Sequence, residues 1–254
     1  MTKINYLISI FSLVSLSSFT YYTEKIFYLG NANCKLTETG QSDKLARFIS
    51  LHDDENTSVE AYISIKSSLP HAKLFELKQT GERLLKYNIN GTNYFFDPNR
   101  LFSTIGIKKT IVKYNKTYPK ELEQGIKSIS DSLLKFINPK SQNTYIVAIH
   151  NNTENNFSVL TYKNSKDAIE VFISKSEDID NFFIVTNKTD FDYFKLLNRN
   201  VVLQSKEADD DGSLSIFAQK NGVPYINIET QHGQLNQQIK MIQETYSLIK
   251  NKIK

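Results

Sequence analysis

The sequence predicts an α/β fold, a three-layer α/β/α sandwich with a mixed, mostly parallel central sheet. Short apolar runs typical of buried strands alternate along the 254-residue chain with longer segments whose apolar residues recur at helical spacing. The run TYIVAIH, residues 144–150, is apolar at its centre, which is typical of a strand buried on both faces of a sheet. No internal repeat and no linker rich in Pro, Gly or Ser divides the chain, so residues 23–254 are expected to form a single domain.

The first half of the chain shows both kinds of segment. LARFISLH, residues 45–52, is a β-compatible apolar run that predicts a strand, and residues 56–69 space their apolar side chains as a helix does. AKLFEL, residues 72–77, predicts a short strand. The dipeptide Asn90-Gly91 between two apolar-aromatic runs indicates a β-hairpin. Residues 119–137 place apolar side chains at intervals of three or four, which predicts an amphipathic helix.

The second half alternates in the same way. The apolar runs at 182–187 and 223–229 predict strands, and Gly222 is suited to ending a helix. The final segment, 235–253, carries apolar residues at intervals of three and four, which predicts an amphipathic helix packed on the sheet. The remaining expected strands are 144–150, 157–162, 169–174 and 201–205, and the remaining expected helices are 190–198 and 212–222.

The charge of the chain argues against a nucleic-acid partner. The net charge is +4 and the pI is about 8.8, and Lys and Arg are scattered among nearly as many acids. No basic stripe of the kind that tracks a phosphate backbone is present. Hydrophobic residues make up 40% of the chain, which is enough for a sizeable core. We expect a monomer that does not bind nucleic acid.

Residues 1–22 are predicted to be a signal peptide or an N-terminal anchor. Lys3 precedes an apolar run from Ile4 to about Val14, and the small-residue patch 15–18 follows. The apolar run is short for a stable membrane span. The chain is therefore expected to be exported, as a periplasmic or secreted protein that contacts a membrane only through an uncleaved N-terminus. Cys34 is the only cysteine, so it is expected to be a free thiol.

One stretch, SLHDDENTSVEAY, raises the question of a metal site. It holds His52, one of four histidines in the chain, with Glu55 three residues later. Taken alone, the spacing has two interpretations: half of a metal site at a strand-to-helix turn, or a solvated polar loop. Asp53 and Asp54 would then be spacers, or partners that orient His52.

Two further polar residues stand where predicted strands end. His150 ends the strand at 144–150, and Glu229 ends the strand near the C-terminus. In open α/β sheets, ligands bind outside the carboxyl ends of the strands. If these strands lie side by side, both residues would meet His52 and Glu55, and a His₂Glu set is one known arrangement for catalytic zinc. The alternatives are a hydrogen-bonded strand-end histidine and a salt-bridged strand-end glutamate.

The stretch FFDPNRLF, residues 95–102, is more distinctive. Pro98 stiffens a turn, and Asn99 and Arg100 follow it directly. A guanidinium beside a metal can hold a substrate carboxylate through two parallel hydrogen bonds. The alternative is a structural arginine that caps a loop. Glu229, in turn, is suited to act as general base towards a metal-bound water.

The order His-x-x-Glu, Asn-Arg, strand-end His and late strand-end Glu resembles that of the zinc carboxypeptidase family. This family includes carboxypeptidase A and, as a divergent branch, the succinylglutamate desuccinylase/aspartoacylase group. The resemblance spans about residues 45–250 and is carried by motif order and strand context. FDPNRLF is its most specific part, because the family's Asn-Arg pair often sits in an Asp-x-Asn-Arg-x-Phe stretch. The sequence departs from the family in its short length, in HDDE, which lacks the small residues often found inside the zinc motif, and in a mobile tyrosine that cannot be placed.

The resemblance implies a role for each matching residue. It implies that one Zn²⁺ ion is bound by His52, Glu55 and His150, a ligand set that carboxypeptidase A uses. It also implies that Asn99 and Arg100 hold the free α-carboxylate of the substrate.

The catalytic roles implied by the resemblance fall to two further residues. Glu229 would activate the zinc-bound water and return its proton to the leaving amine. Arg83, in TGERLL, would be the upstream arginine that steadies the oxyanion. The acidic stretch Asp209 to Asp211 would either read a basic or amine-bearing substrate side chain or cap the helix near Ser213.

The resemblance therefore implies a zinc-dependent metallocarboxypeptidase that hydrolyses a C-terminal amide bond. Its substrates would be peptides with a free carboxylate, and export favours short peptides or cell-wall stem peptides. One alternative is a zinc-dependent deacylase of N-acyl amino acids, as in the desuccinylase branch. Another is a catalytically inactive binding domain of the same fold.

Overall fold

The computed structural model describes residues 22–29, 32–137, 143–154 and 156–252. Its strands are β1 (Tyr22–Leu29), β2 (Ala32–Thr39), β3 (Ala46–Ser50), β4 (Ala72–Lys78), β5 (Leu85–Ile89), β6 (Thr92–Phe96), β7 (Tyr145–Asn152), β8 (Ala168–Phe172), β9 (Phe182–Val185), β10 (Asn200–Gln204) and β11 (Tyr225–Gln231). Its helices are α1 (Asn56–Ile65), α2 (Thr104–Tyr114), α3 (Lys120–Ile137), α4 (Lys188–Leu196), α5 (Leu214–Asn221) and α6 (Leu235–Lys252), with short 3₁₀ turns η1 (Lys66–Ser68), η2 (Pro98–Arg100) and η3 (Val159–Tyr162).

The described strands form a nine-stranded mixed sheet in the order β1-β2-β4-β3-β7-β11-β9-β10-β8, and β5 pairs with β6 in a separate hairpin. The four strands β4, β3, β7 and β11 run parallel to one another at the centre of the large sheet. Antiparallel pairs occur towards both edges, at β1-β2 and β2-β4 on one side and at β11-β9 and β10-β8 on the other. Because β3, β7 and β11 are parallel neighbours, their carboxyl ends meet at one edge of the sheet, which is the condition on which the predicted site depended.

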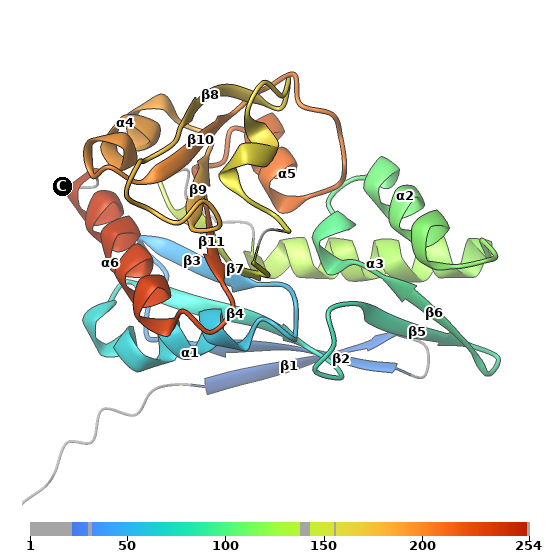
Figure 1. Ribbon diagram of the computed structural model, residues 1–254. Coiled ribbons are helices and arrows are strands. Elements are labelled where there is room, and N and C mark those ends of the chain that lie inside the picture. The colour runs from blue at the N-terminus through green and yellow to red at the C-terminus, as the bar shows by residue number, and fades with distance from the viewer. Residues whose placement is uncertain (1–21, 30–31, 138–142, 155, 253–254) are drawn as a thin grey trace, which may run out of the picture.

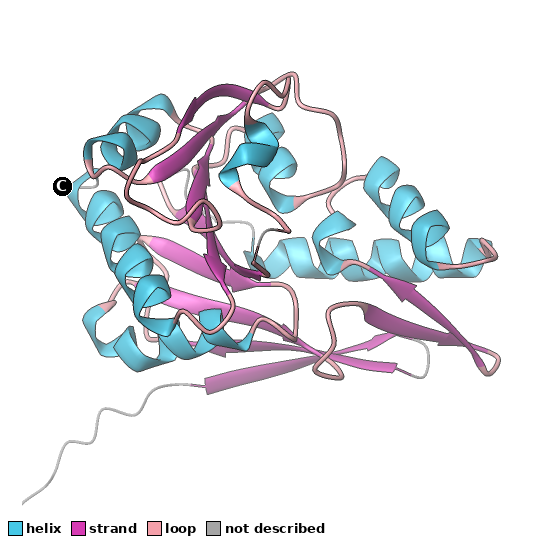
Figure 2. Ribbon diagram, viewed as in Figure 1, coloured by secondary structure: helices cyan, strands magenta, loops and turns pink. Residues whose placement is uncertain are grey.

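Helices cover both faces of the sheet, which confirms the predicted three-layer α/β/α architecture (Figure 1, Figure 2). Apolar side chains of α1, α4 and α6 pack on one face, where Phe48 and Val147 are fully buried. Apolar side chains of α2, α3 and α5 pack on the other face, with Ile49 and Ile146. Burial on both faces explains why the central strands are almost continuously apolar.

One predicted element is not found, and three observed elements had not been predicted. Residues 157–162 were expected to be a strand, but they contain the 3₁₀ turn η3, in which Val159 is buried and Leu160 is largely exposed. The apolar and β-compatible residues there resemble a strand, yet the backbone turns, as the hydrogen bond from Thr161 N to Ser158 O shows. Helix α2 and the strands β1 and β2 had not been predicted. The predicted hairpin is confirmed, with Asn90 and Gly91 both at positive φ.

The predicted signal peptide or anchor, residues 1–22, lies outside the described residues except for Tyr22, where β1 begins. None of the helices in the described part of the chain is long and apolar enough to cross a membrane. Cys34 is a free, fully buried thiol, as expected, and its burial, with a smaller contribution from Asp53, raises its pKa to about 12.

A close contact between two glycines joins α2 to the loop before α5. A Cβ atom at Gly106 would stand 2.3 Å from the Cα of Gly212 and 2.5 Å from the carbonyl oxygen of Arg100. Gly212 also accepts a hydrogen bond from Phe102 N at 3.0 Å. Only residues without a side chain permit this approach, so the two glycines fix the loop against η2, where Arg100 is located.

Candidate metal centre

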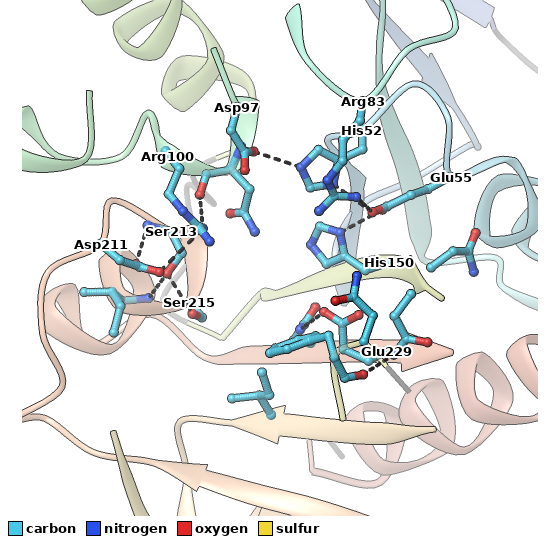
Figure 3. A pocket seen from close by; sticks show the side chains of 18 of the residues that line it. His52, Glu55, Arg83, Asp97, Arg100, His150, Asp211, Ser213, Ser215 and Glu229 are labelled. Carbon is cyan, nitrogen blue, oxygen red and sulfur yellow. Dashed lines mark hydrogen bonds and ion pairs between the residues drawn. The ribbon is translucent and has the colours of Figure 1, made fainter. Parts of the chain in front are cut away.

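Three neighbouring strands bring the predicted ligands together. His52 follows β3 by two residues, and a hydrogen bond from Glu55 N to His52 O, at 3.2 Å, turns the chain into α1. His150 belongs to β7 and pairs in register with Glu229 of β11. Figure 3 shows these four side chains around one pocket. The edge of the parallel strands thus holds all four residues that the strand ends predicted.

The carboxylate of Glu55 lies between the two histidines. Its Oε1 is 2.8 Å from His52 Nδ1, and its Oε2 is 2.8 Å from His150 Nδ1. One possible ligand atom from each of the three residues lies within 4.8 Å of the others, and all three side chains are buried. Glu55 also occupies the N-cap position of α1, but its side chain makes no cap hydrogen bond and is free to face the histidines.

The second ring nitrogen of His52 is held by another carboxylate, because its Nε2 lies 2.9 Å from Asp97 Oδ1. Burial lowers the pKa of His52, but Glu55 and Asp97 outweigh this effect and raise it to about 9. Because each ring nitrogen of His52 lies against a carboxylate, the imidazole carries an extra proton in the metal-free protein. Burial raises the pKa of Glu55, but the two histidines outweigh it and hold that pKa well below its ordinary value.

This donor set fits a zinc ion. Two imidazole Nδ1 atoms and one carboxylate converge, which is a three-ligand set used for catalytic zinc. A cation at their centre would take the place of the proton on His52, and Asp97 would keep the ring oriented by accepting the hydrogen bond from Nε2. We therefore assign His52, Glu55 and His150 as the residues that could hold the metal.

The two acids between His52 and Glu55 do not orient the histidine. Asp53 Oδ2 accepts hydrogen bonds from Gln79 N and Gly81 N, both at 2.7 Å, so this side chain holds the loop after β4. Asp54 Oδ1 has no hydrogen-bond partner among the described residues. The proposal that either residue orients His52 is therefore wrong, and Asp97 makes that contact instead. The signal for Asp97 in the sequence was its place in the Asp-x-Asn-Arg stretch, which gave no indication of a contact with His52.

Glu229 is buried at the end of β11, with 6% of its surface exposed. Its Oε1 accepts a hydrogen bond from Asn227 Nδ2 at 2.8 Å, and it forms no ion pair within the described part of the chain. Its pKa is raised, first by burial and then by the charge of Glu55, although His150 opposes this. The alternative of a salt-bridged strand terminus therefore does not apply to the described part of the chain, and the raised pKa favours a side chain that can accept and return a proton.

Asn99 and Arg100 stand in the 3₁₀ turn η2, which Asp97 caps by accepting a hydrogen bond from Asn99 N at 2.8 Å. Asn99 Oδ1 accepts from Leu214 N at 3.0 Å, so the turn is also tied to α5. Arg100 Nη1 donates to Asn99 O at 2.6 Å and lies 3.5 Å from Asp211 Oδ2. Its side chain remains 35% exposed and lines the pocket.

Arg83 reaches the same pocket from the loop before β5. Its Nη1 donates to Glu55 Oε1 at 2.8 Å, and half of its side chain is exposed. The guanidinium therefore stands beside the candidate ligands, with room to face a bound substrate.

The pocket has a volume of about 660 Å³. Its lining includes every residue predicted for the site, namely His52, Glu55, Arg83, Asn99, Arg100, His150 and Glu229. Sequence reasoning missed other lining residues, among them Asp97, Tyr162 and Asn227, of which Tyr162 lay in a segment interpreted as a strand.

The acidic stretch before α5 mainly shapes its own loop. Asp210 Oδ1 accepts from Gly212 N at 3.0 Å, and Asp211 Oδ1 accepts from Ser213 N at 2.9 Å. Ser213 is the N-cap residue of α5, and Asp209 pairs with Lys166 at 2.8 Å. Ser213 caps α5 with its own side chain, and Asp210 and Asp211 hold the loop that leads into the cap, so neither aspartate caps the helix itself. Asp209 and Asp211 also line the pocket.

No protein-family model matches the sequence, and no curated protein matches it. Among solved structures, a succinylglutamate desuccinylase from Vibrio parahaemolyticus is similar with a TM-score of 0.48 and 14% identity, over 92% of this chain and 68% of that one. Murein-tripeptide amidase MpaA from Escherichia coli O157 is similar with a TM-score of 0.45 and 11% identity, over 90% of each chain. Bovine thrombin-activatable fibrinolysis inhibitor is similar with a TM-score of 0.46 and 11% identity, over 90% of this chain and 91% of that one. All three TM-scores are below 0.5, so the function is inferred below from the residues of the site.

Proposed function

We propose that this protein is a zinc-dependent metallocarboxypeptidase, which hydrolyses the amide bond before the C-terminal residue of a peptide. One observation carries the proposal: Glu55 joins His52 and His150 in a buried cluster, and the same pocket holds Glu229 and Arg100. A metal-ligand set, a general base and a carboxylate-binding cation are the three parts that such a hydrolysis needs.

Each part has a chemical task. Zinc bound by the three ligands would polarise the scissile carbonyl and lower the pKa of water from 15.7 to about 7. Glu229, whose pKa is raised by burial, would accept the proton of the attacking water and deliver it to the leaving nitrogen. Arg100 would hold the terminal carboxylate and so orient the substrate. Arg83 would donate to the oxygen on which negative charge develops.

The compartment and the substrate are part of the same proposal. The charge, apolar run and small residues at positions 3–18 support export. An exported carboxypeptidase would meet short peptides or cell-wall stem peptides, and we propose these as its substrates.

Incubation with a substrate panel tests the proposal. The purified, zinc-loaded protein is mixed with short peptides, muropeptides and N-acyl amino acids, with and without a chelator, and the products are identified by mass spectrometry. We expect loss of the C-terminal residue from peptides, abolished by the chelator. Cleavage of N-acyl amino acids alone would assign the deacylase activity instead, and no turnover of any substrate would support an inactive binding domain.

Two comparisons test the roles proposed for Glu229 and Arg100. Glu229→Gln should lower kcat by about 10²- to 10⁴-fold while zinc content stays unchanged. Glu60→Gln, the same change on the exposed side of α1, should leave kcat unaltered. A peptide with an amidated C-terminus should be a poor substrate, because Arg100 then has no carboxylate to bind. Equal cleavage of the amide and the free acid would remove that role from Arg100.

A further inference from the structure

The lining of the pocket extends past Glu229 to side chains of β9, β10 and β11 that the proposed chemistry does not use. Asn227 of β11 pairs in register with Ile184 of β9, and Ile184 pairs with Val202 of β10. Residues two apart on a strand share a face, so Gln204 points to the same side of the sheet as Val202 and Asn227. Gln204, Ile184 and Asn227 all line the pocket.

Two buried acceptors in this part of the pocket lack partners. Gln204 Oε1 and Asn227 Oδ1 have no hydrogen-bond partner among the described residues, and the two side chains are 3% and 5% exposed. The amide group of Asn227 is oriented, because its Nδ2 donates to Glu229 and its oxygen therefore faces away. A buried acceptor without a donor is unfavourable by about 1–3 kcal/mol. Two of them in one cavity indicate a ligand that brings hydrogen-bond donors.

The charge around these acceptors indicates which kind of donor. Tyr162 of η3 lines the same pocket, and its pKa is raised by burial and then by the negative charges of Glu229, Asp211 and Asp167. The positive charge of Arg100 acts against them, but it ranks after all three. The potential in this part of the pocket is therefore negative, which favours a cationic donor over a neutral one.

We propose that the C-terminal residue of the substrate carries an amine-bearing side chain, whose ammonium group donates to Gln204 and Asn227. An ammonium group offers three donors and no acceptor, which matches two carbonyl oxygens in a negative pocket. Ile184, 3% exposed and level with Asn227 on the neighbouring strand, would contact the aliphatic stem. The inference rests on the proposed carboxypeptidase function, because it takes the terminal residue to lie between Arg100 and these strands.

Binding of free amino acids tests the inference without turnover. Lysine, ornithine, norleucine and glutamine are titrated into the zinc-loaded full chain by calorimetry. We expect lysine or ornithine to bind at least about tenfold more tightly than norleucine, which has no donor. Norleucine binding as tightly as lysine, or no binding of lysine at millimolar concentration, would overturn the inference. Glutamine as the tightest ligand would replace the ammonium group with a neutral donor and would overturn it as well.

A substitution at Gln204 tests whether the unpartnered side-chain oxygen causes the preference for lysine over norleucine. Gln204→Met keeps the volume of the side chain and removes the oxygen, so the preference for lysine should fall to about threefold or less. Gln243→Met, the same change on the exposed side of α6, should leave the preference unchanged. An unaltered preference in Gln204→Met would contradict the assignment. If that variant does not fold, the comparison of lysine with norleucine in the wild type still decides the inference.

Peptide cleavage separates this inference from the proposed function. Two N-acylated dipeptides that differ only in a C-terminal lysine or norleucine are compared by kcat/KM. Preferential lysine binding without cleavage of either dipeptide would leave the pocket assignment standing and refute the carboxypeptidase proposal. Equal cleavage of both, together with equal binding of the free amino acids, would support the carboxypeptidase and refute the pocket assignment.

Discussion

Replacing Asp97 by Asn tests how the metal centre is held in place. The Asp97 carboxylate accepts from His52 Nε2 at 2.9 Å, and the two side chains are only 10% and 1% exposed. A hydrogen bond to a charged group contributes about 1.5–3 kcal/mol. Loss of such a partner of a metal-bound histidine weakens metal affinity by 10- to 100-fold, or about 1.4–2.7 kcal/mol. The two ranges agree, so we expect the zinc Kd of Asp97→Asn to rise by about 10- to 100-fold.

The assay is competition for zinc with a chelator of known affinity, at constant pH. The variant keeps the turn η2, because the amide oxygen of Asn can accept from Asn99 N as Oδ1 of Asp97 does. The same oxygen faces His52 Nε2, so the substitution removes the negative charge of the partner and leaves a neutral acceptor. Asp53→Asn is the matched control, since Asp53 lies next to His52 in the sequence but bonds only to the loop after β4. Its zinc Kd should stay within about twofold of the wild type. The reasoning is refuted if Asp97→Asn changes the Kd less than twofold, or if Asp53→Asn weakens binding equally.

Three further predictions follow. In the chelator-treated protein, the pKa of His52 is raised from 6.5 to about 9, so its contribution to stability is complete below pH 6.5 and is lost as the pH rises to 9. Urea denaturation should show a loss of up to about 3 kcal/mol between these values, and a flat profile would contradict the assignment. Gly106→Ala should lower the free energy of unfolding by about 1–3 kcal/mol and raise KM, because the added methyl group would clash with backbone atoms. Gly125→Ala should lower it less, because the methyl group added there would meet a tyrosine side chain. Arg83→Gln should lower kcat by about 10²- to 10³-fold at unchanged zinc content, and an unchanged kcat would limit Arg83 to its ion pair with Glu55.

The sequence predicted the fold class and the site because both depend on local patterns at strand ends. A buried parallel strand is apolar along its length, so a His or Glu at its end is conspicuous. His150 and Glu229 were found in this way, and their pairing in register follows from β7 and β11 being neighbours. The hairpin at Asn90-Gly91 was predicted because only a few residues favour positive φ.

The contacts that hold the site together depend on the tertiary fold and could not be predicted from local pattern. Asp97 is 45 residues from His52, and nothing in HDDE indicated that a distant carboxylate would displace its two neighbours as the histidine's partner. The segment that contains η3 has the β-compatible composition of a strand, and only the folded structure shows that it turns. The unpartnered oxygens of Gln204 and Asn227 are visible only once β9, β10 and β11 are placed side by side.

The zinc content of the purified protein tests the central claim most directly. The wild type and the variants His150→Ala and His71→Ala are each loaded with zinc and desalted, and their zinc content per chain is measured by elemental mass spectrometry. His71 is exposed and distant in the sequence from the cluster, so its variant serves as the matched control. We predict one zinc per chain in the wild type and in His71→Ala, and almost none in His150→Ala. A wild type without stoichiometric zinc, or a His150→Ala variant that retains it, would contradict the account.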